Sequence, residues 1–187
     1  TAEIAPCIAC NQACLDHTFS GKLSSCLVNP RACHETELTY APTTVPKRLA
    51  VVGAGPAGMT AAIVAAERGH QVVVFDQADQ VGGQLNLARK VPGKEEFDGL
   101  VTWFDTMLRK TGVSLRLGQE ARPNDLTAFD EVILYQDAAQ RGRADGEVLA
   151  LLRDGLKDAA RTRCIDEVRG EFAAIDTALQ RLQPGDL

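Results

Sequence analysis

The stretch "LAVVGAGPAGMTAAIVAA", residues 49–66, decides the fold of this chain. It carries G-x-G-x-x-G at Gly53, Gly55 and Gly58, between an apolar run typical of a buried strand and a run of helix-forming residues. Gly53 permits the tight turn, Gly55 lets a pyrophosphate approach the backbone, and Gly58 lets helix and strand pack closely. The stretch therefore predicts a dinucleotide-binding turn at the carboxyl end of a strand.

The same run is uncharged over a length close to that of a membrane span. Glycines and Pro56 interrupt it, and a strand, a turn and a helix start explain them better than a transmembrane helix does. Pro56 and Ala57 then open the helix, whose free N–H groups and positive dipole favour phosphates. We expect no membrane segment.

The next strand, "QVVVFD" at residues 71–76, ends on Asp76, where an acid can accept hydrogen bonds from ribose hydroxyls. The fingerprint alone does not separate FAD from NAD(P). A second glycine pair, Gly82 and Gly83, follows in "QADQVGGQL", and this resembles the pattern of flavin-binding reductases with two dinucleotide domains. An acidic Asp76 with no adjacent Arg argues against a 2′-phosphate. We therefore favour FAD.

Residues 47–134 read as an α/β domain, a Rossmann-like half-domain with a parallel sheet. Residues 95–112 show a helical stripe and end on Gly112. The stripe consists of Phe97, Leu100, Val101, Phe104 and Leu108. Two short runs, at 113–117 and 130–134, predict further strands.

Cysteines crowd the irregular segment 1–46, which ends in a predicted linker at 39–46. Four of them follow the pattern C-x2-C-x3-C-x11-C at Cys7, Cys10, Cys14 and Cys26. Disulfides are disfavoured because the first two lie too close together and the neighbouring fold is typically intracellular, so we expect a cytoplasmic protein. Four thiolates suit a structural zinc ion and a 4Fe–4S cluster equally. The redox fingerprint downstream favours the cluster.

Composition adds limits to this interpretation. The chain has 187 residues and a net charge of −5, so we expect no nucleic-acid-binding or anionic-membrane face. Cys33 reads as a spare thiol or a substitute ligand, and His34 beside it reads as an ordinary polar residue or a fourth zinc ligand. Cys164 reads as a packing residue.

The run "CIACNQACLDHTFSGKLSSCLVNPRACHE", residues 7–35, followed by a linker and the glycine turn, resembles a known family. This is the family of iron–sulfur flavoprotein reductases that includes 2,4-dienoyl-CoA reductase and trimethylamine dehydrogenase. The resemblance covers roughly residues 5–134, including "GGQLNLARKVPGKEEF" and "FDEVIL".

In that family a barrel domain binds FMN and substrate, and electrons pass from NADPH through FAD and the cluster to FMN. The resemblance implies an oxidoreductase, incomplete alone, with the barrel domain as partner. It implies that the cluster ligands are Cys7, Cys10, Cys14 and Cys26. It places in the FAD site Gly53, Gly55, Gly58, Asp76, Gly83 and Gln84.

The chain departs from that family after residue 134. The barrel and the NADPH domain are absent, so we expect a fragment. Residues 135–187 predict a helical tail with one apolar stripe, formed by Ile165, Val168, Phe172, Ile175, Leu179 and Leu182. The tail resembles the C-terminal end of the Mur-ligase-like domain of cyanophycin synthetase, an ATP-dependent ligase. For the tail, a helical pair covering the sheet is the preferred interpretation over a ligase role. For the function of the chain, the alternatives to the oxidoreductase fragment are an ATP-dependent ligase fragment and a zinc-stabilised, non-catalytic dinucleotide-binding module.

Overall fold

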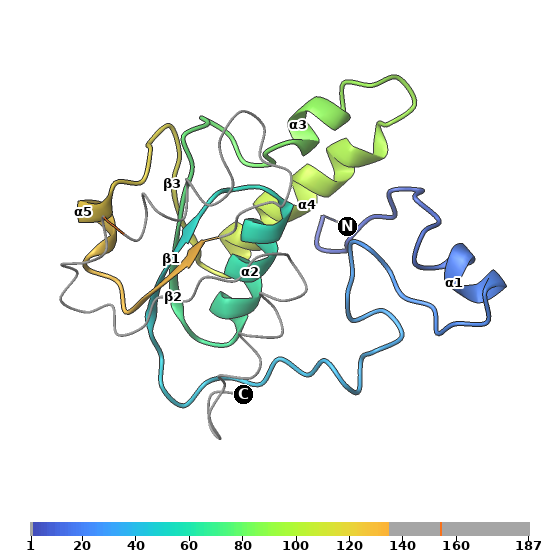
Figure 1. The fold of residues 1–187 in the computed structure, drawn as a ribbon, viewed down its shortest axis with the longest axis horizontal. Helices are drawn as coiled ribbons and strands as arrows, with labels where there is room; N and C mark the ends of the chain where they lie inside the picture. Colours follow the sequence, from blue (N-terminus) through green and yellow to red (C-terminus); the bar gives the residue numbers. More distant parts are fainter. Residues whose placement is uncertain (1, 135–153, 155–187) are drawn as a thin grey trace.

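The computed structural model describes residues 2–134 and 154. Its centre is a four-stranded parallel sheet in the order β3-β2-β1-β4 (Figure 1). The strands are β1 (Arg48–Val52), β2 (Gln71–Phe75), β3 (Ser114–Arg116) and β4 (Glu131–Leu134). This sheet confirms the predicted α/β class and all four predicted strands.

The helices cover the two faces of the sheet unequally. On one face lie α2 (Pro56–Glu67) and α4 (Glu96–Lys110), and on the other lies α5 (Pro123–Leu126) (Figure 1). The larger core packs against α2 and α4, whereas the smaller one holds Ala50, Phe75, Leu126 and Phe129. Central strands buried on both faces explain the continuous apolar content of β1 and β2.

The predicted stripe of α4 is confirmed, because Leu100, Val101, Phe104 and Leu108 are buried. Phe97 is partly buried and packs against the same core. Gly112 follows the helix with a φ of 76°, a value that favours glycine. The short helices α1 (Leu15–Phe19), α3 (Leu85–Ala88) and α5 were not predicted. The stripe predicted for residues 165–182 and the packing of Cys164 lie outside the described residues.

Residues 2–46 are largely irregular, as expected, and α1 is their one helix. Their only buried side chain is Ala13, which leaves this segment without a core of its own. The start of the segment lies beside α4, whereas α1 extends away from it (Figure 1). The Glu3 carbonyl accepts the indole N–H of Trp103 at 3.3 Å, and the Glu3 carboxylate pairs with Lys110.

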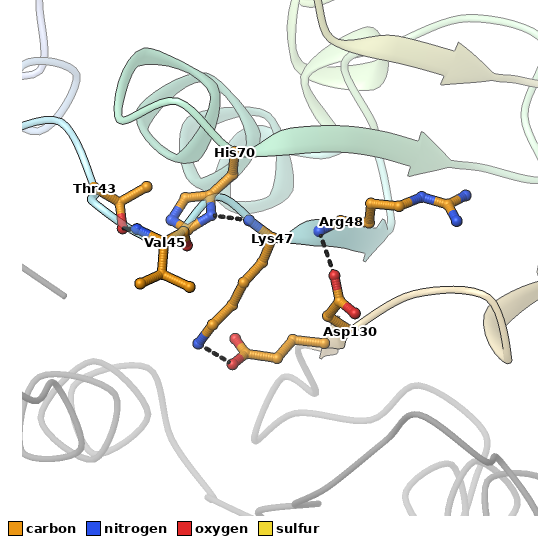
Figure 2. Close-up of polar contacts among 7 residues, drawn as sticks. Thr43, Val45, Lys47, Arg48, His70 and Asp130 are labelled. Atoms are coloured by element: carbon orange, nitrogen blue, oxygen red, sulfur yellow. Dashed lines mark hydrogen bonds and ion pairs between the residues drawn. The ribbon is translucent and has the colours of Figure 1, made fainter.

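The linker joins the sheet at the amino end of β1 (Figure 2). The Lys47 N–H donates to His70 Nδ1 at 3.1 Å, and the Arg48 N–H donates to Asp130 Oδ2 at 2.8 Å. The Lys47 ammonium pairs with Glu131 at 2.7 Å. These bonds fix where β1 begins. Across residues 2–134 and 154, no helix combines the length and the apolar character that a membrane span requires.

Candidate functional site

The glycine turn lies at the carboxyl edge of the sheet. Gly53 has a φ of +111°, and its N–H donates to the Phe75 carbonyl at 2.8 Å, so it leaves β1 in a conformation that favours glycine. Gly55 caps α2 with extended backbone, and a Cβ built on it would meet nothing within 4 Å. Open space at this position is what close approach of a pyrophosphate requires.

Gly58 holds the turn and the helix in contact. A Cβ at this position would lie 2.0 Å from the Gly53 carbonyl oxygen and 3.3 Å from a methyl of Val51. No real Cβ tolerates the first distance, so only glycine fits. The role predicted for Gly58, close packing of helix on strand, agrees with this geometry.

The start of α2 supplies polar groups toward the turn. Pro56 is the first helical residue, and the first backbone bond that follows runs from the Met59 N–H to the Gly55 carbonyl at 2.9 Å. The N–H groups before it, including that of Ala57, belong to the first turn, which has no intrahelical acceptors. Together with the helix dipole they make this end favourable for an anion.

A second turn lies directly against the first. Gly82 and Gly83 have φ values of 117° and 52°, and the Gly82 N–H donates to the Ala54 carbonyl at 2.8 Å. A Cβ on Gly83 would come within 2.9 Å of the Gly55 Cα. The two glycine turns therefore form one continuous backbone surface. Gln84 follows as the exposed cap of α3, next to that surface.

Asp76 connects both turns to the end of β2. Its Oδ2 accepts the Ala54 N–H at 2.6 Å and its Oδ1 accepts the Ala78 N–H at 2.8 Å. Each carboxylate oxygen has a second lone pair, so a ribose hydroxyl can still donate to it. Asp76 thus has a structural task besides the predicted one.

Strand pairing brings Arg116 next to the end of β2. The Asp76 N–H donates to the Arg116 carbonyl at 3.1 Å. The Arg116 guanidinium lies over the Phe75 ring, 5.3 Å from the ring centre. The predicted preference against a 2′-phosphate at Asp76 stays a prediction.

The cysteine segment is folded into two tight loops. Cys7 Sγ accepts the Ala9 N–H at 3.3 Å, and Ala9 and Asn11 have φ values of 52° and 58°. The longer loop between Cys14 and Cys26 is closed at its base. There the Ser25 N–H donates to the Ala13 carbonyl at 2.8 Å, and the hydroxyls of Thr18 and Ser24 lie 2.7 Å apart.

The four predicted ligands are nevertheless not gathered. Among residues 2–134 and 154, no three His, Cys, Asp or Glu side chains lie close enough together to hold a metal ion. The five cysteines up to residue 33 are all free thiols. The metal site therefore stays a prediction.

Comparison with known proteins bears on the sheet region. Residues 51–115 match a family model described as an NAD(P)-binding Rossmann-like domain. The sheet and its helices form a Rossmann-like domain. This confirms the fold class, and the glycine turns and Asp76 lie at the edge where such domains bind nucleotides.

Related proteins resemble this chain over more than two thirds of its length. A metal reductase from Desulforamulus reducens is 47% identical over 130 residues, covering 69% of this chain and 20% of its own length. An NADH oxidase from Thermoanaerobacter brockii is 41% identical over 138 residues, covering 71% and 21%. A 2-naphthoyl-CoA reductase, solved with 2-naphthoyl-CoA, is 32% identical with a TM-score of 0.70, covering 78% and 23%.

The chain thus spans about a fifth of the length of the curated relatives it matches. These relatives are named as oxidoreductases, which supports the coarse functional prediction. The matches give no support to the predicted resemblance of residues 135–187 to the Mur-ligase-like domain.

Sequence reasoning missed Asn86 beside the Rossmann-like domain's second turn. Its Nδ2 donates to the Val81 carbonyl at 2.9 Å, and its amide lies against Gly82. A polar residue three positions after a glycine pair was the available signal, but no periodicity or motif distinguishes it from an exposed Asn.

Proposed function

We propose that this chain is the electron-relay part of a flavoprotein oxidoreductase, with FAD on the Rossmann-like domain and a 4Fe–4S cluster on the cysteine segment. The observation that carries the proposal is the open space at Gly55, where the second glycine turn stands against the first and Asp76 accepts the Ala54 N–H. The names of the relatives, a metal reductase and an NADH oxidase, support electron transfer as the task.

The residues of the Rossmann-like domain fit a dinucleotide. The pyrophosphate would lie over Gly55 at the start of α2, and the adenosine ribose would lie at Asp76. The contact between Gly83 and Gly55 supports FAD, because it widens the backbone surface beyond a single glycine turn. Bound flavin would supply the electron chemistry. The chain's own residues bind the phosphates and orient the adenosine half.

The cysteine segment fits a cluster in its donor set and in part of its geometry. The four predicted ligands, Cys7, Cys10, Cys14 and Cys26, are free thiols. The hydrogen bond from Ser25 to Ala13 joins the two ends of the second loop, and Cys14 and Cys26 follow directly after these two residues. The Ala9 N–H bond to Cys7 Sγ is of a kind that stabilises thiolate charge at such sites. The four side chains would have to converge when the cluster binds.

A larger partner explains the surface of this segment. Large apolar side chains of this segment are exposed to solvent, and Phe19 is the most exposed of them, at 84%. The others include Ile4, Leu15, Leu23 and Leu27. Several exposed apolar side chains within one segment suit a surface that another domain covers. We assign it to the barrel domain that the resemblance implies. Phe19→Ser should lower the binding of a hydrophobic dye without lowering the melting temperature.

Titration with FAD tests the dinucleotide site. Gly55→Val should weaken FAD binding at least about tenfold, because the side chain fills the space of the pyrophosphate. The Cβ itself would meet nothing within 4 Å, so the loss of stability of the cofactor-free chain should be no more than the roughly 1 kcal/mol expected for a poor N-cap residue. Gly99→Ala on α4 is the matched control. Binding of NADH in place of FAD would reassign the cofactor, and binding of neither would end the proposal.

Anaerobic purification with iron, sulfide and zinc analysis tests the cluster. Cys10→Ser should abolish iron and sulfide binding and bleach the brown colour, while FAD binding stays largely intact. Cys33→Ser is the control that should keep the colour. Zinc without sulfide in the wild-type chain would replace the cluster with a structural zinc ion.

A further inference from the structure

Asn86 lies beneath the second glycine turn. Its Nδ2 donates to the Val81 carbonyl at 2.9 Å in a part-buried position. Both polar atoms of its amide lie 2.9 Å from the point where a Cβ on Gly82 would be. The Asn86 side chain therefore occupies the space next to Gly82 and is hydrogen-bonded to Val81, the residue before Gly82.

That turn is one wall of the dinucleotide site. The Gly82 N–H donates to the Ala54 carbonyl, and Gly83 stands against the Gly55 Cα. Gly82 and Gly83 both have positive φ, a conformation that glycine adopts without preference over others. Contacts from outside the two glycines limit their freedom. Backbone bonds supply part of this restraint, and the Asn86 side chain adds a bond to the Val81 carbonyl at the start of the turn.

Local stability does not account for an amide at this position. Asn86 Oδ1 is buried and has no hydrogen-bond partner among the described residues. An unsatisfied buried acceptor lowers stability, which an apolar side chain of the same shape would avoid. The Nδ2 group, which donates to the Val81 carbonyl, is therefore the part of the amide that stabilises the turn.

We propose that Asn86 is a positioning residue for the dinucleotide: its amide holds the Gly82–Gly83 turn against Gly55 in the arrangement that the pyrophosphate needs. The inference rests on the proposed function and deepens it. Asn86 acts through the backbone of the turn and need not touch the ligand.

The test uses the full chain and three variants. Asn86→Ala should weaken FAD binding about three- to tenfold, the loss expected for one hydrogen bond. Asn86→Leu keeps the shape, so it should weaken FAD equally while the melting temperature of the cofactor-free chain does not fall. Asn124→Ala, an exposed Asn on α5, is the matched control and should change neither quantity.

Amide hydrogen exchange gives a readout that needs no cofactor. The Gly82 N–H should exchange faster in Asn86→Ala and Asn86→Leu than in wild type, whereas Gly53 and the strands should not change. If wild type binds FAD and both variants bind it equally, the inference is wrong and the proposed function stands. If no dinucleotide binds, the proposed function fails, and unchanged Gly82 exchange would then overturn the bracing role as well. Restored FAD affinity in Asn86→Leu would reduce Asn86 to a packing residue.

Discussion

The cysteine segment and the Rossmann-like domain differ in how much of their side-chain surface is buried. Residues 2–46 bury one side chain, Ala13, whereas the domain that follows has two cores around its sheet. The domain's site is backbone held in place by strands and helices before any ligand binds. The segment's predicted ligands are free and not gathered. A site made by packing is formed in advance, and a site made of thiolates on loops depends on its ion.

Metal removal should give the largest contrast between the two regions. With metal bound, residues 7–26 should resist proteolysis, because the ion supplies the cross-links that a core would otherwise give. After treatment with a chelator under reducing conditions, this segment should be cut, while fragments containing β1 to β4 stay intact. Mass spectrometry of the fragments measures this. Equal resistance with and without metal would show that the segment folds on its own.

Gly58→Ala should destabilise the Rossmann-like domain and leave the cysteine segment unaffected. The added Cβ would lie 2.0 Å from the Gly53 carbonyl oxygen, so α2 must move away from β1. We expect a loss of about 3 kcal/mol in the free energy of unfolding, at the upper end for overpacking. Urea unfolding measures it. Gly55→Ala is the matched control, because its Cβ meets open space, and it should change stability by less than about 1 kcal/mol.

Asp76→Ala should have an intermediate effect. The change leaves the N–H groups of Ala54 and Ala78 without their acceptor, one of them part-buried. We expect a loss of about 2 kcal/mol from bonds to a charged acceptor, together with weaker FAD binding. Asp79→Ala, an exposed acid in the same loop, should change neither. Loss of FAD binding with unchanged stability would mean that the backbone bonds of Asp76 contribute little.

The regular elements of the Rossmann-like domain could be predicted because local and global signals agree there. Apolar continuity in β1 and β2, the stripe of α4 and the glycines that end helices each point to the element that forms. The packing role predicted for Gly58 agrees with the close approach of α2 to the turn, because the motif ties one residue to one steric requirement. These signals need only the neighbouring residues.

What the sequence did not show depends on contacts between distant residues. Arg116 reaches the end of β2 only through strand pairing, and α3 is too short for periodicity to reveal it. Asn86 acts on a turn through one bond to a backbone carbonyl, for which no residue pattern exists. The cysteine spacing predicted a ligand set, but spacing says nothing of where the side chains converge.

The smallest effect concerns the contact that joins the two regions. The hydrogen bond and the charge of Lys110 hold the pKa of Glu3 below its ordinary value. A carboxylate with a lowered pKa stabilises the docked segment above its ordinary pKa, and this contribution is lost as the pH falls through the lowered value. The chain's only Trp, Trp103, donates to the Glu3 carbonyl, so its fluorescence reports docking. On acidification from about pH 6 to about pH 3, across the usual range for Glu, we expect the emission to shift.

Two variants separate this contact from general acid unfolding. Lys110→Gln should move the midpoint of the fluorescence shift upward, because the pKa of Glu3 then returns toward its ordinary value. Arg109→Gln removes a neighbouring charge that pairs with Asp105 within α4, so it should leave the midpoint where it is in wild type. Because both groups of the Glu3–Lys110 pair are exposed, salt should weaken the pair and move the wild-type midpoint upward as well. A midpoint that changes with neither Lys110→Gln nor salt would mean that the ion pair does not hold the segment, and that the Trp103 bond and the packing of Ile8 and Val28 on the main core do.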